Sequence, residues 1–235
     1  MDLEANLASI QQRIGAACSR VGRDVASVTL LAVAKGQPPE AVSQAAALGL
    51  TLFGENKVQE AKAKIPACSS RLHWHMIGHL QTNKCRDAVE LFEMIQSVDS
   101  LHVAEEVNKR AEQAGKRIPV LLEVNAVGEA SKFGYPPDLL LSELPRLNAL
   151  PRLEIHLLMT VPPWSADPEK VRPVFRQLRE LKRRSDEILG APLLHLSMGM
   201  SGDFEVAIEE GATLVRIGTA LFGPRAAARV KASTA

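Results

Sequence analysis

The feature that most constrains the fold is an alternation of short apolar runs with longer segments of helical spacing. Helix-forming stretches such as Leu101–Gly115 and Glu169–Leu189 separate the runs from one another. Strands that alternate with helices in this way predict parallel βαβ units. The runs, rich in β-branched residues, are eight in number: Val28–Ala34, Thr51–Phe53, Leu72–Ile77, Phe92–Val98, Ile118–Val124, Leu153–Thr160, Leu193–Leu196 and Thr213–Ile217.

A chain of 235 residues with eight such units is close to the usual size of a (β/α)8 barrel. We therefore predict an α/β fold with one TIM-barrel domain over residues 1–235, the barrel lying at about 28–228. An extra helix at about residues 2–21 is expected to pack on the barrel through an apolar stripe of Leu3, Leu7, Ile10, Ile14 and Val21. A doubly wound open sheet is the alternative, but its G-x-G-x-x-G fingerprint is missing.

The charge balance and the cysteine pattern exclude several classes of protein. Lys and Arg number 28 and Asp and Glu 27, so the net charge of +1 lacks the basic excess of a duplex-binding protein. No stretch approaches the roughly 18 uninterrupted apolar residues of a membrane span. The start MDLEANLASI is unlike a secretion signal, and Cys18, Cys68 and Cys85 form no C-x-x-C motif. We expect a cytosolic protein that binds neither nucleic acid nor membrane.

Polar and glycine-rich residues follow the predicted strands. In a barrel of this kind the active site lies at the carboxyl ends of the strands, so residues from distant parts of the sequence meet at one mouth. The residues at these ends are Lys35, Gly54-Glu55-Asn56, Gly78-His79, Asn125, Met159-Thr160, the segment from Ser197 to Gly202 and the segment from Arg216 to Thr219.

Lys35 has the most specific chemistry of these residues. Its ammonium follows the apolar run from Leu30 to Ala34, and burial at such a position lowers the pKa of a lysine. A neutral amine is what imine formation with an aldehyde or a ketone requires. The alternative is a lysine whose stem lies along the strand end while its charge reaches solvent. Lys35 alone does not decide between the two.

Two loops predict a phosphate site across the mouth from Lys35. SMGMSGDFEVAI and RIGTALFG occupy the last two strand ends, where barrel enzymes often bind phosphate. Small residues let the backbone approach an anion, hydroxyls donate hydrogen bonds, and helix starts offer unpaired N–H groups. The alternative is ordinary helix capping by Ser201, Asp203 and Thr219. A lysine opposite a phosphate site suggests pyridoxal 5'-phosphate or a sugar-phosphate aldolase substrate.

The histidines raise the separate possibility of a metal site. His73 and His75 in HWH point to one side of the third strand, and His79 lies beyond its end. An H-x-H pair can ligate a metal. No further carboxylate or histidine stands at another strand end in a ligand role, so we predict no metal. We interpret His156 and His195 as hydrogen-bonded residues of the interior.

Six elements occur in an order that points to a known family. They are LLAVAKGQP, LFGENKVQEAKAK, LHWHMIGHLQTNK, VLLEVNAVGEASKFG, LEIHLLMT and LSMGMSGDFEVAIEEGATLVRIGTALFGPR. Through them the chain resembles the pyridoxal 5'-phosphate homeostasis protein family, from the leading helix to about Arg225. The resemblance implies a barrel of the alanine racemase amino-terminal type that holds the cofactor as an imine on Lys35. The other cofactor contacts that it implies are Ser201, Gly218 and Thr219 at the phosphate with Ser197 and Met198 nearby, Arg216 at the pyridine nitrogen, and Asn56 and His79 at the mouth.

Arg216 favours a carrier of the cofactor over a racemase. Because arginine has donors only and stays protonated, it leaves the ring nitrogen unprotonated and the ring a poor electron sink. We expect no second domain after the last helix-like stretch to supply an opposite base, and the only tyrosine, Tyr135, is a weak candidate. We therefore expect a monomeric carrier or regulator that serves apo-enzymes, with a one-domain amino-acid racemase as the alternative.

Overall fold

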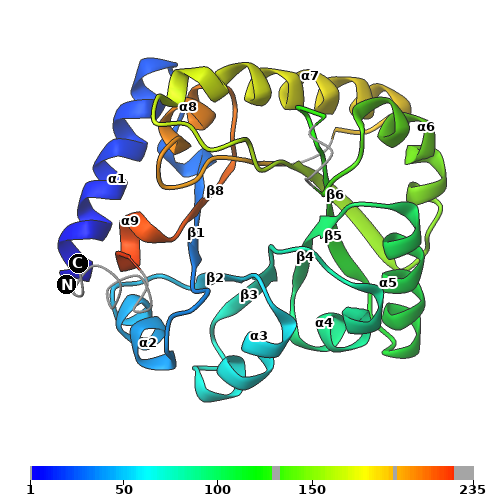
Figure 1. The fold of residues 1–235 in the computed structure, drawn as a ribbon, viewed down its shortest axis with the longest axis horizontal. Helices are drawn as coiled ribbons and strands as arrows, with labels where there is room; N and C mark the ends of the chain where they lie inside the picture. The colour runs from blue at the N-terminus through cyan, green and yellow to red at the C-terminus, as the bar shows by residue number, and fades with distance from the viewer. Residues whose placement is uncertain (1, 129–132, 193–194, 225–235) are drawn as a thin grey trace, which may run out of the picture.

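Eight parallel strands close into a barrel in the computed structural model, which describes residues 2–128, 133–192 and 195–224 (Figure 1). Neighbours in the sequence are neighbours in the sheet, and β1 pairs with β8 to complete the circle. The predicted barrel is therefore confirmed. Its strands are β1 (Thr29–Val33), β2 (Leu52–Glu55), β3 (His73–Met76), β4 (Met94–Val98), β5 (Ile118–Glu123), β6 (Leu153–Met159), β7 (His195–Ser197) and β8 (Leu214–Ile217).

A helix follows each strand and covers the outside of the barrel (Figure 1). The α-helices are α1 (Leu3–Arg20), α2 (Pro39–Ala47), α3 (Val58–Lys64), α4 (Cys85–Leu91), α5 (Leu101–Gln113), α6 (Pro137–Asn148), α7 (Arg172–Leu189), α8 (Phe204–Glu209) and α9 (Thr219–Phe222). Short 3-10 helices are η1 (Val25–Ser27), η2 (Ile65–Ala67), η3 (Thr82–Lys84) and η4 (Pro168–Val171). Among the helices of the described residues, none is long and apolar enough to cross a membrane.

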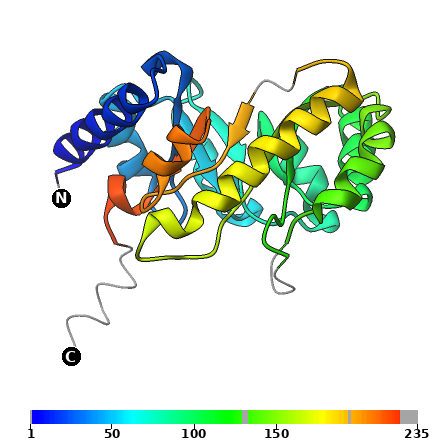
Figure 2. The ribbon, with the colours of Figure 1, turned by 90° about the horizontal axis from the view of Figure 1, so that it is seen from above.

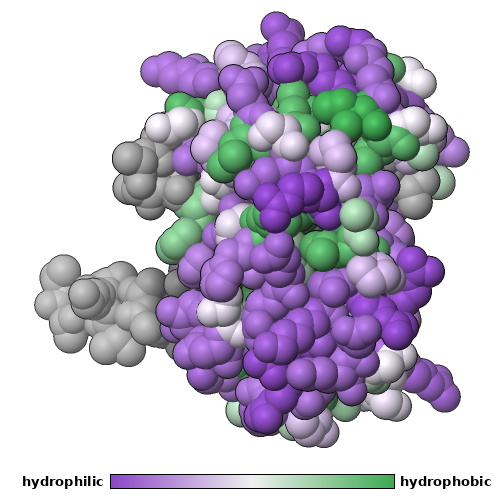
Figure 3. Space-filling model, turned by 90° about the vertical axis from the view of Figure 1, so that its right-hand side faces the viewer, coloured by the Kyte–Doolittle hydropathy of each residue, from purple (hydrophilic) through white to green (hydrophobic). Residues whose placement is uncertain are grey.

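Helix α5 shows how the sequence forms these elements. The Ser100 hydroxyl caps it by accepting a hydrogen bond from the Val103 N–H at 3.3 Å. Val103, Val107 and Ala111 then recur every fourth residue and bury one face against the barrel. The opposite face is polar. Figure 3 shows that the side of the molecule on which α5 and α6 lie is largely hydrophilic, with hydrophobic residues in its upper part and across its middle.

The extra helix predicted at the amino end is α1, which packs against α8 and α9 (Figure 2). The Asp2 carboxylate caps it by accepting from the Ala5 N–H at 2.9 Å. Leu7, Ile10 and Ile14 are buried as the stripe predicts. Val21 is not part of this face, because it forms the C-cap and is 42% exposed.

Strand β2 is longer at its carboxyl end than predicted. The predicted run ends at Phe53, but the strand continues through Gly54 to Glu55. Gly54 faces a crowded part of the barrel interior. A Cβ on Gly54 would lie 2.5 Å from Leu31 Cδ2 and 2.9 Å from Ile77 Cδ1. Glu55 is therefore a strand residue and not part of the following loop.

Strand β7 also differs from its predicted span. It includes Ser197, whereas the first two residues of the predicted run, 193 and 194, lie outside the described residues.

Candidate functional site

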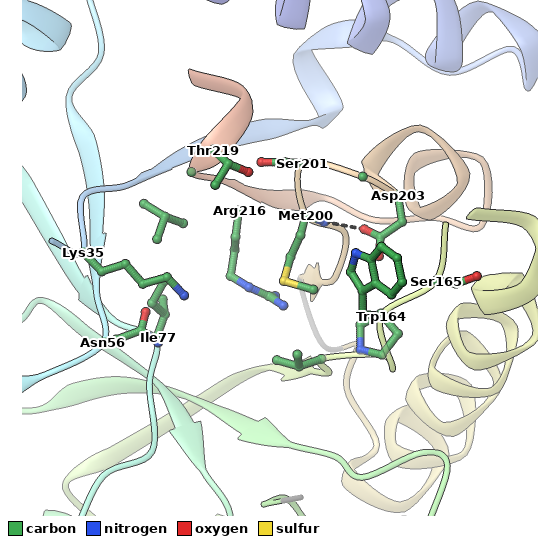
Figure 4. A pocket seen from close by; sticks show the side chains of 15 residues that line it. Lys35, Asn56, Ile77, Trp164, Ser165, Met200, Ser201, Asp203, Arg216 and Thr219 are labelled. Atoms are coloured by element: carbon green, nitrogen blue, oxygen red, sulfur yellow. Dashed lines mark hydrogen bonds between the residues drawn. The ribbon is translucent and has the colours of Figure 1, made fainter. Parts of the chain in front are cut away.

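A cavity of about 550 Å³ opens at the carboxyl ends of the strands, where a barrel is expected to carry its site. Side chains from the ends of β1, β2 and β3 line one side of it (Figure 4). The other side is formed by the loops that follow β6, β7 and β8. Segments that lie more than a hundred residues apart in the sequence thus meet at one mouth.

Lys35 lies two residues beyond the end of β1 and is half-buried. Its side chain points into the cavity towards Arg216 (Figure 4). The backbone before it continues the barrel pairing, since the Ala34 N–H donates to the Gly54 carbonyl at 2.9 Å. The turn after it uses Gly36 at a φ of 69°, a left-handed conformation that favours glycine.

Arg216 lies on β8 with only 4% of its surface exposed. Its Nη1 donates to Ser197 Oγ at 2.7 Å and its Nη2 to the Thr160 carbonyl at 2.8 Å. Burial lowers the pKa of the guanidinium to about 10, although Glu123 and Asp203 favour its charged form. Arg216 is therefore a fixed cation at neutral pH.

A chain of hydrogen bonds crosses the barrel beneath Arg216. Ser197 Oγ donates to Gln96 Oε1 at 2.7 Å, and Gln96 Nε2 lies 2.8 Å from His75 Nδ1. Burial lowers the pKa of His75 to about 4, so its ring is neutral and its Nδ1 accepts from Gln96. Ser197 therefore supports the guanidinium and does not line the cavity.

Four further residues contribute hydrogen-bonding groups near Lys35 and Arg216. The Ser201 hydroxyl accepts from the Ala220 N–H at 3.1 Å, which leaves its own proton available to donate. Gly218 and Thr219 line the cavity where β8 ends and α9 begins. Asn56 lines it from the end of β2, and its buried Oδ1 has no hydrogen-bond partner among the described residues.

Of the nine predicted site residues, the structure brings six together around the cavity: Lys35, Asn56, Ser201, Arg216, Gly218 and Thr219. The other three lie outside the lining. Ser197 is beneath Arg216, and Met198 is fully buried in the core. His79 Nδ1 lies 3.0 Å from Asp99 Oδ2, and the His79 ring stacks on Phe133 with 3.6 Å between centroids.

Comparison with known proteins gives the family. The family model of the alanine racemase N-terminal domain matches residues 3–226. The pyridoxal phosphate homeostasis protein of Aquifex aeolicus is 45% identical over 220 residues, which cover 93% of this chain and 96% of that protein. The protein of the same name from Pseudomonas aeruginosa is 44% identical and covers 94% of each chain. The chain belongs to the pyridoxal phosphate homeostasis protein family.

Solved structures of this family and of its distant relatives have the same architecture. PipY of Synechococcus elongatus with pyridoxal phosphate bound is 38% identical, with a TM-score of 0.81 over 91% of this chain and all of that one. An alanine racemase of Clostridium difficile, 17% identical, has a TM-score of 0.73, and the chain covers 56% of it. The racemase shares the fold of the homeostasis protein family.

The loop after β6 carries cavity residues that the sequence analysis did not single out. Val161, Pro162 and Ser165 line the cavity together with Trp164, whose surface is 89% exposed (Figure 4). The available signal was their place directly after a predicted strand end. Asp203, interpreted as a possible cap, also lines the cavity, and its Oδ1 accepts from the Met200 N–H at 2.6 Å.

The interior position predicted for His195 is wrong. His195 begins β7 and is exposed, whereas the two residues that follow it in the strand are buried. His156 is only partly buried, with its Nε2 3.6 Å from Glu154 Oε2. His73 is paired with Glu93 at 2.7 Å and lies apart from the cavity. Within the described residues, no cluster of three or more His, Cys, Asp or Glu side chains could hold a metal ion.

Glu123 is a buried acid at the end of β5. It is 8% exposed, and its Oε2 has no hydrogen-bond partner in the described part of the chain. Burial, together with the negative charge of Asp99, raises its pKa to about 7, although Arg216 favours the ionised form. A raised pKa means that the folded protein binds this proton more tightly than the unfolded chain does.

The folded protein should therefore lose stability, relative to Glu123→Gln, as pH rises from about 4.5 to about 7. A pKa shift of this size lowers the free energy of unfolding, relative to that of Glu123→Gln, by roughly 2 to 3 kcal/mol between a pH of about 5 and a pH of about 7.5. Urea unfolding of both proteins across this pH range measures the difference in stability. The lowered pKa of His75 makes stability rise with pH, but this contribution is the same in both proteins and cancels in the difference. A difference that does not change with pH would contradict the burial of an acid at this position.

Proposed function

We propose that the protein binds pyridoxal 5'-phosphate at Lys35 and acts as a carrier or regulator of this cofactor, without turnover of a substrate. The observation that carries the proposal is a single cavity in which the amine of Lys35 faces Arg216 and two hydroxyl-bearing loops. The acceptors of the cofactor are then apo-enzymes that use it. The names of the relatives and the cofactor bound in PipY support the same conclusion.

The residues present fit this cofactor. When bound, pyridoxal phosphate supplies three groups: a phosphate dianion, a pyridine nitrogen, and an aldehyde that can form a Schiff base with a primary amine. Lys35 provides the amine, and the hydroxyls of Ser201 and Thr219 with the Gly218 backbone provide donors to an anion. The unpartnered Oδ1 of Asn56 leaves a buried acceptor in the cavity wall that the described protein atoms do not satisfy.

Arg216 provides the donor for the ring nitrogen. Its hydrogen bonds to Ser197 and to the Thr160 carbonyl fix the plane of the guanidinium, and Gln96 fixes Ser197 in turn. Because arginine cannot accept a hydrogen bond, it would donate to an unprotonated ring nitrogen and could not pair with a protonated one. This disfavours the protonated ring on which α-carbon chemistry depends.

The position of Tyr135 also argues against a racemase. Tyr135 is 1% exposed and does not line the cavity. Burial raises the pKa of its phenol, which makes it harder to ionise. Asp203 is the one acidic side chain among the described residues of the lining, which makes it the candidate base within that part of the chain.

Proton exchange at the α-carbon of amino acids tests the carrier proposal. In deuterated buffer, the protein loaded with pyridoxal phosphate should exchange the α-proton of alanine or serine no faster than free pyridoxal phosphate does. Nuclear magnetic resonance detects the exchange even without net turnover. Exchange well above that of the free cofactor, and lost in Asp203→Asn or Tyr135→Phe, would make the protein an enzyme.

The phosphate site makes a separate prediction. Ser201→Ala and Thr219→Ala should each weaken binding of pyridoxal phosphate by roughly 1 to 3 kcal/mol, as expected for one hydrogen bond to a charged group. Binding of unphosphorylated pyridoxal should change little, and titration of both ligands measures the contrast. Equal losses for the two ligands would show that these hydroxyls serve only the backbone, as Ser201 does for the Ala220 N–H.

A further inference from the structure

Helix α3 holds the backbone on both sides of Lys35. The Lys64 Nζ donates to the Ala34 carbonyl at 2.6 Å. The Gly36 N–H donates to Glu60 Oε2 at 3.2 Å. The Ala34 carbonyl also accepts from the Gln37 N–H at 3.0 Å, which closes the turn that carries Lys35. Two side chains of one helix thus reach the residues before and after the amine.

Lys64 is itself fixed by a buried ion pair with Glu55. Lys64 is 7% exposed and Glu55 is fully buried. Side chains alternate along a strand, and Gly54 faces the barrel interior, so Glu55 points outwards beneath α3. Burial raises the pKa of Glu55, and the hydrogen bond from Lys64 opposes this shift. The second oxygen, Oε2, has no hydrogen-bond partner among the described residues.

A buried ion pair of this kind is not expected to add much to the stability of the fold. Desolvation of two charges often exceeds their attraction, and well-packed apolar residues of similar volume are frequently as stable or more so. The desolvation here also leaves one carboxylate oxygen unsatisfied. What the pair does achieve is a cation held at the carbonyl that precedes Lys35. The geometry therefore relates the pair to the position of the amine.

We propose that Lys64, held by Glu55 and assisted by Glu60, is a positioning residue for Lys35. The proposal rests on the proposed function, because it concerns the attachment point of the cofactor. A lysine side chain has a flexible stem of four carbons. Its amine therefore reaches the same position in the cavity each time only if the backbone that carries it is fixed. We call Lys64, Glu55 and Glu60 together the clamp. It acts from the outer side of the barrel wall and leaves the cavity free for the ligand.

The double variant Glu55→Leu/Lys64→Met tests this role, since it removes both charges with little change in volume. In the unliganded protein, hydrogen exchange of the Gly36 and Gln37 amides should accelerate about tenfold, the effect of losing one charge-assisted hydrogen bond. The dissociation constant for pyridoxal phosphate should rise by a similar factor, with the borohydride-reduced adduct still on Lys35. The thermal midpoint should change little. Lys62→Met is the matched control, because Lys62 is on the same helix but pairs with Asp87 at 3.2 Å.

Unchanged exchange at Gly36 and Gln37, or unchanged affinity in a folded double variant, would overturn the proposal. Glu60→Ala provides a second test that leaves the buried pair intact, and it should accelerate exchange at Gly36 alone. Exchange there equal to that of the unmodified protein would remove Glu60 from the clamp. The exchange measurements need no ligand, so a protein that never acquires a cofactor adduct on Lys35 would refute the proposed function and leave the clamp to be judged separately.

Discussion

Replacement of Lys35 by alanine is expected to abolish covalent attachment of pyridoxal phosphate while the barrel stays folded. The side chain lines the cavity and is only half-buried, so its loss removes little packing from the core. Two other described lysines, Lys64 and Lys57, are not placed to replace it. Lys64 is buried and paired with Glu55, whereas Lys57 is 70% exposed on the outside at the start of α3.

The measurement is borohydride reduction of protein incubated with pyridoxal phosphate, followed by mass mapping of the adduct. The unmodified protein should carry one adduct on Lys35, and Lys35→Ala none, with an unchanged circular dichroism spectrum. Lys57→Ala is the matched control and should label normally. A stable adduct of equal yield on Lys57, Lys64 or Lys84 would show that Lys35 is not the attachment point.

The fold was predictable from the sequence because its main signal is periodic. Each strand needs an apolar run and each helix an apolar stripe, and eight alternations leave few ways other than a barrel to pair all strand edges. Element ends were predicted less well. Gly54 was interpreted as a loop residue, whereas it lies within β2 and faces the side chains of Leu31 and Ile77 inside the barrel.

The candidate site was only partly predictable, because a residue's place after a strand does not fix its depth. Ser197 and Met198 follow the seventh predicted run, yet Ser197 lies beneath Arg216 and Met198 is in the core. His195, predicted to be interior, starts its strand and reaches solvent. Contacts between different elements also leave no periodic pattern in the sequence. The place of Trp164 in the cavity wall and the ion pair between Glu55 and Lys64 could therefore not be predicted.

Replacement of Arg216 by methionine is expected to have the largest effect on stability of any single change in the site. The guanidinium is buried, satisfies Ser197 and the Thr160 carbonyl, and favours the ionised form of Glu123. Removing one member of such a set leaves the others buried without partners, which typically costs about 3 to 5 kcal/mol. Arg216→Glu is a poorer test, since it places a third carboxylate beside Glu123 and Asp203.

Urea unfolding of the unliganded protein at a pH of about 7 measures this loss, and Thr219→Ala serves as a control at the cavity surface. Without Arg216 the pKa of Glu123 should rise further, because its one favourable charge is gone. The stability lost in Arg216→Met should therefore become smaller as the pH falls below the pKa of Glu123. The double variant Arg216→Met/Glu123→Gln should recover part of this stability at neutral pH. A loss no greater than that of Thr219→Ala would mean that the guanidinium does not support the buried chain from Ser197 through Gln96 to His75.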